Sequence, residues 1–252
     1  MATRSVRVIG AAIAAFFGLS GSIPAQGPNN DSPAGLVQRA AAAHGKSNGA
    51  ADPQDWVAEG KLIVFATDGP KGTFDVTLQH KGTSQVQRII KETAGELKQG
   101  TDGTRTWESF GGFYTPAAQG RALQFIESQT VRSTQRLFNH QSEGLTLHDK
   151  GKKDNANLVE AEDRNGKKTT YHVDTATSVI RKLEFIAGQG KDPFSGKLVD
   201  IPETFVFSDY RSIQGLLTPF KIERFNDGIK TEEMQFTAVR YNAGLKDQDF
   251  KH

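Results

Sequence analysis

Histidines and carboxylates are the residues of this chain whose types could support acid–base or metal chemistry. His172 and Asp174 are two positions apart, so a strand would place both on one face, where they could form an acid–base pair or bind a metal. His148 and Asp149 are adjacent, and a strand would point them to opposite faces. No third ligand accompanies either pair. We therefore expect surface strand ends at both places, with a hydrolase that uses His172 and Asp174 as an alternative.

Motifs for other chemistries are missing from the sequence. There is no HExxH zinc motif and no GxSxG or SxxK serine motif. The glycine-rich segment 188–196 lacks the GK[ST] ending of a phosphate-binding loop. We expect the remaining strand carboxylates on solvated faces; they are Glu160, Glu162, Glu232 and Glu233. These observations predict a protein that is not an enzyme, with no catalytic residue, no metal site and no cofactor.

The first 26 residues have the pattern of a secretory signal peptide. Arg4 and Arg7 precede an apolar run over 8–19, and small residues follow at 22–26. A transmembrane helix needs about 20 apolar residues, which exceeds this run. We therefore expect cleavage near Ala25 or Gln26, export to the periplasm, and no transmembrane span afterwards.

Charge and cysteine content limit the partners of the exported chain. Two of its 31 basic residues belong to the predicted signal peptide, so the remainder balances the 29 acidic residues and gives no reason to expect nucleic acid. The chain has no cysteine, which excludes disulfides, thiolate chemistry and a lipid-modified cysteine at the cleavage site. A soluble, monomeric protein is the expectation.

Hydrophobic periodicity predicts a single, mainly β (α+β) domain over 27–252. A short helix is expected at 33–44, strands with period-two patterning follow from Trp56 onward, and one or two helices interrupt them at 117–139. Strands then resume and end in a three-stranded meander over 203–241, where Asp227-Gly228 suits a tight turn. About 11 strands in one antiparallel sheet should curl into an incomplete β-barrel, with the helices covering its concave face.

Phenylalanine dominates the aromatic residues, with 16 against four tyrosines and two tryptophans. An apolar concave face could be a filled core or a cavity for a lipid or an acyl chain, and the sequence leaves both open. The residues expected to line such a cavity are Phe65, Phe74, Val76, Leu78, Trp107, Phe125, Phe205, Phe207, Phe220, Ile222, Met234 and Phe236.

Two segments resemble the LolA/LolB-like superfamily of periplasmic lipoprotein carriers and their lipoprotein-sorting relatives. They are YHVDTATSVIRK at 171–182 and the SDYR…G…PF pattern at 208–220, followed by a closing L…F segment at 245–250. The resemblance spans 36–250 and implies a carrier for lipid or lipoprotein acyl chains that meets envelope transport proteins. No arginine aligns with the buried arginine that governs opening of the carrier, although Arg88 and Arg105 lie in suitable strands. An envelope scaffold with a closed core is the alternative.

Overall fold

The computed structural model describes residues 32–46, 53–116, 118, 120–130, 132–191 and 197–251. The predicted signal peptide, 1–26, lies outside the described residues.

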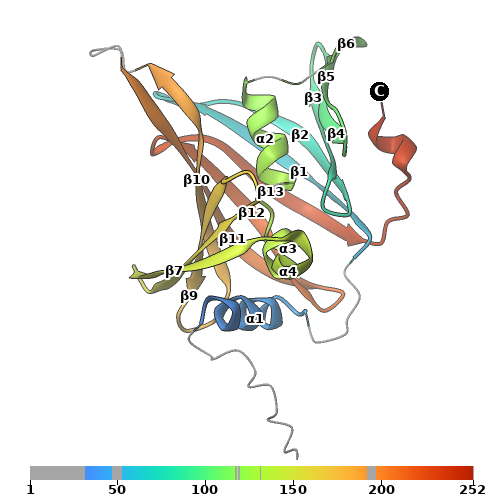
Figure 1. The fold of residues 1–252 in the computed structure, drawn as a ribbon. Helices are drawn as coiled ribbons and strands as arrows, with labels where there is room; N and C mark the ends of the chain where they lie inside the picture. Colours follow the sequence, from blue (N-terminus) through green and yellow to red (C-terminus); the bar gives the residue numbers. More distant parts are fainter. Residues whose placement is uncertain are drawn as a thin grey trace, which may run out of the picture.

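Thirteen strands form one antiparallel sheet in the order β6-β5-β4-β3-β2-β1-β13-β12-β11-β10-β9-β8-β7 (Figure 1). Their bounds are β1 Asp55–Ala66, β2 Gly69–Lys81, β3 Gln85–Glu92, β4 Gly95–Asp102, β5 Thr106–Phe110, β6 Phe113–Pro116, β7 Thr146–Lys153, β8 Ala156–Glu162, β9 Lys168–Asp174, β10 Ile180–Lys191, β11 Leu198–Ile213, β12 Leu216–Asn226 and β13 Ile229–Tyr241.

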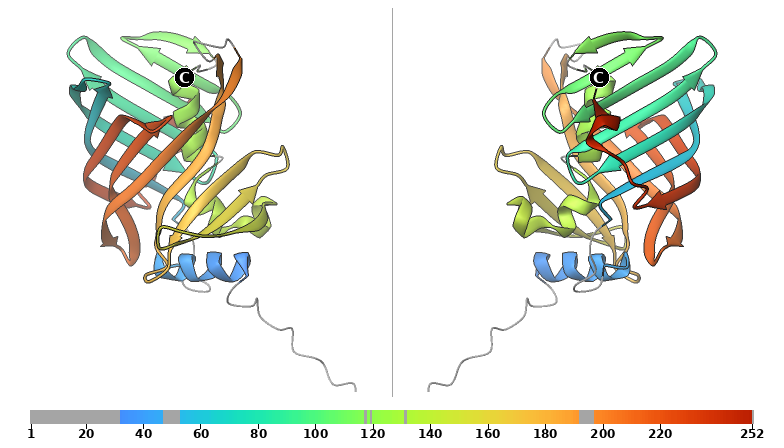
Figure 2. Two further views of the ribbon diagram at one scale, coloured as in Figure 1. Left: turned by 90° about the vertical axis from the view of Figure 1, so that its left-hand side faces the viewer. Right: turned by 90° about the vertical axis from the view of Figure 1, so that its right-hand side faces the viewer.

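The sheet consists of two meanders that meet at one pair of strands. Strands β1 to β6 follow one another, strands β7 to β13 follow one another, and β1 pairs with β13. The sheet curls without closing, so β6 and β7 remain its two edges (Figure 2). The helical segment that links these edges in sequence must therefore cross the open side of the curl.

Within the described residues, four α-helices and one 3₁₀-helix accompany the sheet. Their bounds are α1 Pro33–Ala43, α2 Gly120–Thr130, α3 Thr134–Phe138, α4 His140–Glu143 and η1 Asp247–Phe250. Helix α2 lies in the concavity against β3, β4 and β5, while α1 packs against α3, β7 and β8 at one end (Figure 1). No helix within the described ranges has both the length and the apolar composition to cross a membrane.

A β-bulge helps the sheet to bend where the two meanders meet. The register of β1 on β13 shifts between Glu59 and Gly60. A Cβ atom at Gly60 would lie 2.1 Å from the carbonyl oxygen of Gln235, so only glycine permits this approach.

The predicted fold class is confirmed: the protein is mainly β, with a curled antiparallel sheet that does not close and helices in its concavity. The predicted helices at 33–44 and 117–139 correspond to α1 and to α2 with α3. The sheet has thirteen strands where we expected about 11. Strand β6 in particular escaped sequence analysis, because all four of its residues are exposed and no period-two pattern marks it.

Candidate functional site: an apolar cavity beside a buried ionic cluster

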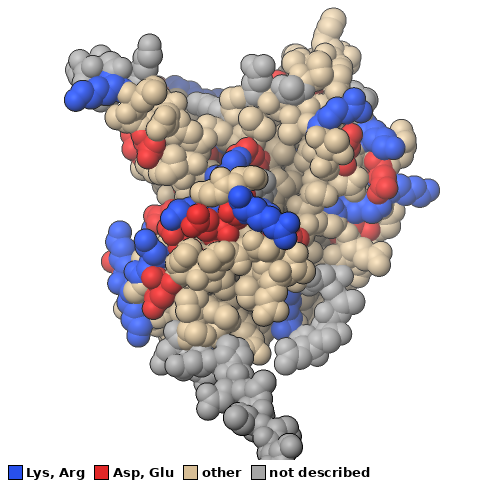
Figure 3. Space-filling model, viewed as in Figure 1, with Lys and Arg blue, Asp and Glu red and all other residues tan. Residues whose placement is uncertain are grey.

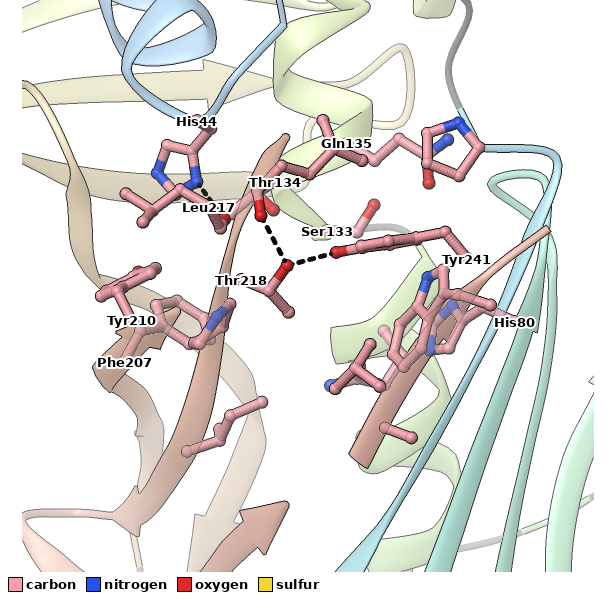
Figure 4. Close-up of a pocket in the computed structure, with 18 of the residues that line it drawn as sticks. His44, His80, Ser133, Thr134, Gln135, Phe207, Tyr210, Leu217, Thr218 and Tyr241 are labelled. Atoms are coloured by element: carbon pink, nitrogen blue, oxygen red, sulfur yellow. Dashed lines mark hydrogen bonds between the residues drawn. The ribbon is translucent and has the colours of Figure 1, made fainter. Parts of the chain in front are cut away.

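A cavity of about 180 Å³ lies between the concave face of the sheet and the helices α1 and α3 (Figure 4). Its apolar wall comes from both meanders, and it includes Ala58, Leu183, Phe205, Phe207, Ile222, Phe236 and Val239. Its helical side carries Ser128 and Gln129 at the end of α2, and Ser133, Thr134, Gln135 and Phe138 at α3. The arrangement can enclose an apolar group and offer it a few polar contacts.

The structure distributes the twelve predicted cavity residues over three places. Four line the cavity: Phe205, Phe207, Ile222 and Phe236. Six more belong to the same hydrophobic core without reaching the cavity: Phe74, Val76, Leu78, Phe125, Phe220 and Met234.

The other two residues lie elsewhere. Trp107 is buried, but its Nε1 donates a hydrogen bond to the carbonyl oxygen of Phe250 at 3.0 Å, so it anchors η1. Phe65 lines a second, separate hollow at the other end of α2, where Lys230 Nζ lies 4.7 Å from the centre of its ring.

His44, at the end of α1, is a cavity residue that sequence analysis missed. Its Nδ1 lies 3.2 Å from the carbonyl oxygen of Leu217, and the backbone N–H of Ile180 donates to its Nε2 at 3.1 Å (Figure 4). These two contacts require a neutral ring with its proton on Nδ1. Burial lowers the pKa of His44, which agrees with that tautomer.

His80 was missed as well, although the sequence held a signal for it. The inward-facing pattern of Phe74, Val76 and Leu78 continues by period two to His80, which is only 5% exposed. Its ring stacks on Trp56 with 4.1 Å between centroids, and no described residue is a hydrogen-bond partner of its Nε2.

Four charged side chains form a buried ionic cluster on the same concave face, next to the cavity. Arg88 Nη1 lies 2.9 Å from Glu232 Oε2, and Arg224 Nη1 lies 3.4 Å from Glu232 Oε1. Arg224 Nε also pairs with Glu203. The expectation that Glu232 and Glu233 are solvated was wrong, since they are 7% and 5% exposed. Glu232 shares the concave face with Met234.

The ionic cluster also holds α2 against the sheet. The Arg88 guanidinium lies 3.8 Å from the centre of the Phe125 ring, and Arg224 Nη2 donates to Gln124 at 3.2 Å. Arg88 is therefore a buried arginine of the concave face, whereas the Arg105 side chain is 80% exposed.

The pKa values of the two carboxyl groups in the cluster are shifted in opposite directions. Burial alone would raise the pKa of Glu232, but the charges of Arg88 and Arg224 outweigh it and hold that pKa below its ordinary value. For Glu203 burial prevails over the opposing charge of Arg224, and its pKa is raised. Glu232 is thus the central anion of the cluster.

His172 and Asp174 do not form a pair in the structure. The expectation of a surface strand end was wrong for His172, which is only 4% exposed, and its Nε2 lies 2.7 Å from Glu184 Oε2. The Asp174 carboxylate instead accepts hydrogen bonds from Ala176 N and Thr177 N at 3.1 and 2.8 Å and so stabilises the turn after β9. The geometry gives no support to a hydrolase at these residues.

His148, Glu160 and Glu162 place three possible metal ligands within 4.8 Å of one another. Lys168 Nζ lies 3.4 Å from a carboxylate oxygen of each glutamate, and Lys150 Nζ lies 3.8 Å from Glu160, so two lysines balance the two glutamates in an ion-pair network. Basic and acidic side chains are interspersed in the same way over the face of the molecule in Figure 3.

Comparison with known proteins yields likeness in structure only. No family model matches the sequence, and no curated protein matches it. A domain from Vibrio parahaemolyticus described as an outer-membrane lipoprotein-sorting protein is similar in structure, with a TM-score of 0.57, 14% identity, and 88% of this chain and 97% of that chain covered.

Two further solved structures are similar over nearly the whole chain. A DUF1329 family protein from Desulfovibrio piger has a TM-score of 0.56 and 14% identity, with 87% of this chain and 96% of that chain covered. A LolA superfamily protein from Nitrosomonas europaea has a TM-score of 0.58 and 15% identity, with 86% and 96% covered. The protein therefore has a LolA-like fold, as its resemblance in sequence predicted.

Proposed function

We propose that this protein is an exported carrier that binds acyl chains of a lipid or lipoprotein in the apolar cavity between its sheet and its helices. The observation that carries the proposal is the apolar wall of the cavity, to which Phe205, Phe207, Ile222 and Phe236 contribute from three strands. The LolA-like fold supports the proposal. Of the solved structures with that fold, one is described as an outer-membrane lipoprotein-sorting protein domain and another as a LolA superfamily protein.

The size of the cavity limits what it can hold without a change of shape. Pockets for drug-sized ligands usually measure about 300–1,000 Å³, and this one measures about 180 Å³. A short chain, or the end of a long one, fits the space as it stands. A longer chain would need α2 and α3 to move away from the sheet, which breaks the contacts of Arg88 with Phe125 and of Arg224 with Gln124.

The test is uptake of a fluorescent fatty-acid ester by the purified protein, with native mass spectrometry to detect lipid that co-purifies. Phe207→Glu places a charge in the cavity wall at a half-buried position, so we expect it to abolish uptake while the protein stays folded. Phe113→Glu is the matched control, since that ring is 84% exposed in β6 and lies outside the cavity.

Uptake by the wild-type protein and by Phe113→Glu, with loss in Phe207→Glu, would support a carrier. A protein that is empty when purified and takes up no probe would favour an envelope scaffold with a closed core. The buried ionic cluster, which already fills part of the concave face, is the feature that fits that second candidate.

A further inference from the structure

One buried polar atom in the cavity has no partner within the described part of the chain. It is Nε2 of His80. Buried polar atoms in proteins are nearly always hydrogen-bonded, and an exception calls for an explanation such as a missing ligand. His80 differs in this respect from His44 in the same cavity, whose two ring nitrogens both have backbone partners.

The position of the His80 ring is fixed by packing. It stacks nearly parallel on Trp56, with 9° between the ring planes, and is 5% exposed. The ring therefore has no room to turn its free nitrogen toward solvent. Two hydroxyl groups, of Thr218 and Tyr241, lie 2.7 Å apart and also line the cavity, so His80 belongs to a polar region within an apolar wall (Figure 4).

We infer that the cavity binds a chain with a neutral, hydroxyl-bearing headgroup, and that Nε2 of His80 forms a hydrogen bond with that hydroxyl. The inference rests on the proposed function and specifies its ligand class. A hydroxyl group both donates and accepts, so it satisfies Nε2 in either tautomer of the neutral ring.

An ionised fatty acid fits the same place less well. Burial lowers the pKa of His80 to about 3, so the ring carries no charge to pair with a carboxylate at neutral pH. Among the described lining residues Lys46 is the only lysine or arginine, and its Nζ lies 5.2 Å from the centre of the Phe138 ring. A carboxylate in the cavity would therefore find its charged partner at Lys46 and not at His80, where a buried carboxylate without such a partner is strongly disfavoured.

The experiment compares a short-chain monoacylglycerol with the fatty acid of the same chain length. Both are titrated at neutral pH by displacement of the fluorescent fatty-acid ester, into wild-type protein, His80→Phe and His80→Gln. We expect the wild type to prefer the monoacylglycerol, and His80→Phe to lower the ratio of monoacylglycerol affinity to fatty-acid affinity about tenfold. His80→Gln retains a side chain that donates and accepts, so it should keep the preference.

The results separate two kinds of failure. If the probe binds but the two lipids bind the wild type equally, or His80→Phe leaves their ratio unchanged, the role of His80 is overturned while the carrier function stands. If neither lipid nor the probe binds the wild type, the proposed function itself fails, and the inference fails with it.

Discussion

The concave face of this protein carries two regions of opposite character within one core. Around α3, the sheet presents an apolar wall to a cavity, and the polar groups there include two histidines held neutral by burial, several hydroxyls and one lysine, Lys46. Beneath α2, the same sheet buries two arginines and two glutamates that pair with one another and reach the helix. One region encloses an apolar space, and the other buries paired charges.

This difference shows which part of the helical layer can move at lower cost. Helix α2 rests on cation–π and hydrogen-bond contacts to Arg88 and Arg224, which would lose their partners if it lifted away. Helix α3 is a five-residue segment, and three of its residues, Thr134, Gln135 and Phe138, line the cavity. We therefore expect a ligand to enter beside α3 and α1, with α2 remaining docked.

The largest expected effect comes from breaking the ionic cluster. Glu232→Gln removes the central anion and leaves Arg88 and Arg224 buried with a neutral neighbour, so the free energy of unfolding should fall by about 3 kcal/mol or more. Urea denaturation at neutral pH measures this loss. Binding of the fluorescent probe to the folded fraction should persist, because Glu232 does not line the cavity.

A matched change on the convex side provides the control for that prediction. Glu59 pairs with Arg240 at 2.9 Å, but their side chains are 48% and 58% exposed. Glu59→Gln should therefore cost at most about 1 kcal/mol. Equal losses in the two variants would show that the cluster is no more important for stability than a surface ion pair.

Packing at the two regions can be compared with a single type of substitution. Phe125→Ala removes a fully buried ring that contacts Arg88, and it should cost about 3–5 kcal/mol. Phe207→Ala removes a half-buried ring that already faces empty space, so fewer contacts are lost and about 1–2 kcal/mol is expected. Denaturant unfolding of the two variants in parallel gives the ratio, and similar losses would mean that the cavity closes in solution.

The two regions also differed in how far sequence could predict them. Period-two patterning gave the strands and their apolar faces, so Phe205, Phe207 and Phe236 were identified before the structure. The paired charges were missed, because Arg88 and Glu232 are 144 residues apart and their partnership depends on β1 joining β13 to bring the meanders together. A local pattern cannot specify such a long-range pairing.

The same period-two alternation nevertheless predicts the burial of some residues that sequence analysis missed. His80 and Glu232 each continue an apolar face by period two, and a strict reading of that alternation would have placed both inside. Their polar and charged side chains favour the surface, but their positions in the alternation favour the core, and in both cases position decides. Trp107 is the converse case. Its large aromatic side chain predicted a place in the cavity wall, but its neighbours Thr106 and Glu108 do not indicate which face of the sheet it occupies. In the structure it anchors η1 instead.

The last expected effect concerns pH and belongs to the cavity region. The folded state holds His80 neutral with a pKa of about 3, whereas the unfolded chain binds a proton near the ordinary value of 6.5. Stability is therefore fully present above pH 6.5 and falls as the pH drops toward 3, because the unfolded state gains protons that the folded state does not.

The contribution of His80 to this loss between neutral pH and pH 5 amounts to about 2 kcal/mol. His80→Phe and His80→Gln both remove the titrating group, so each should lose about that much less stability than the wild type over the same interval, whatever its stability at neutral pH. Urea unfolding at the two pH values provides the measurement. If both variants kept the full acid sensitivity of the wild type, the ring of His80 would have to be accessible to solvent in the folded protein, and the cavity region would then be open rather than enclosed.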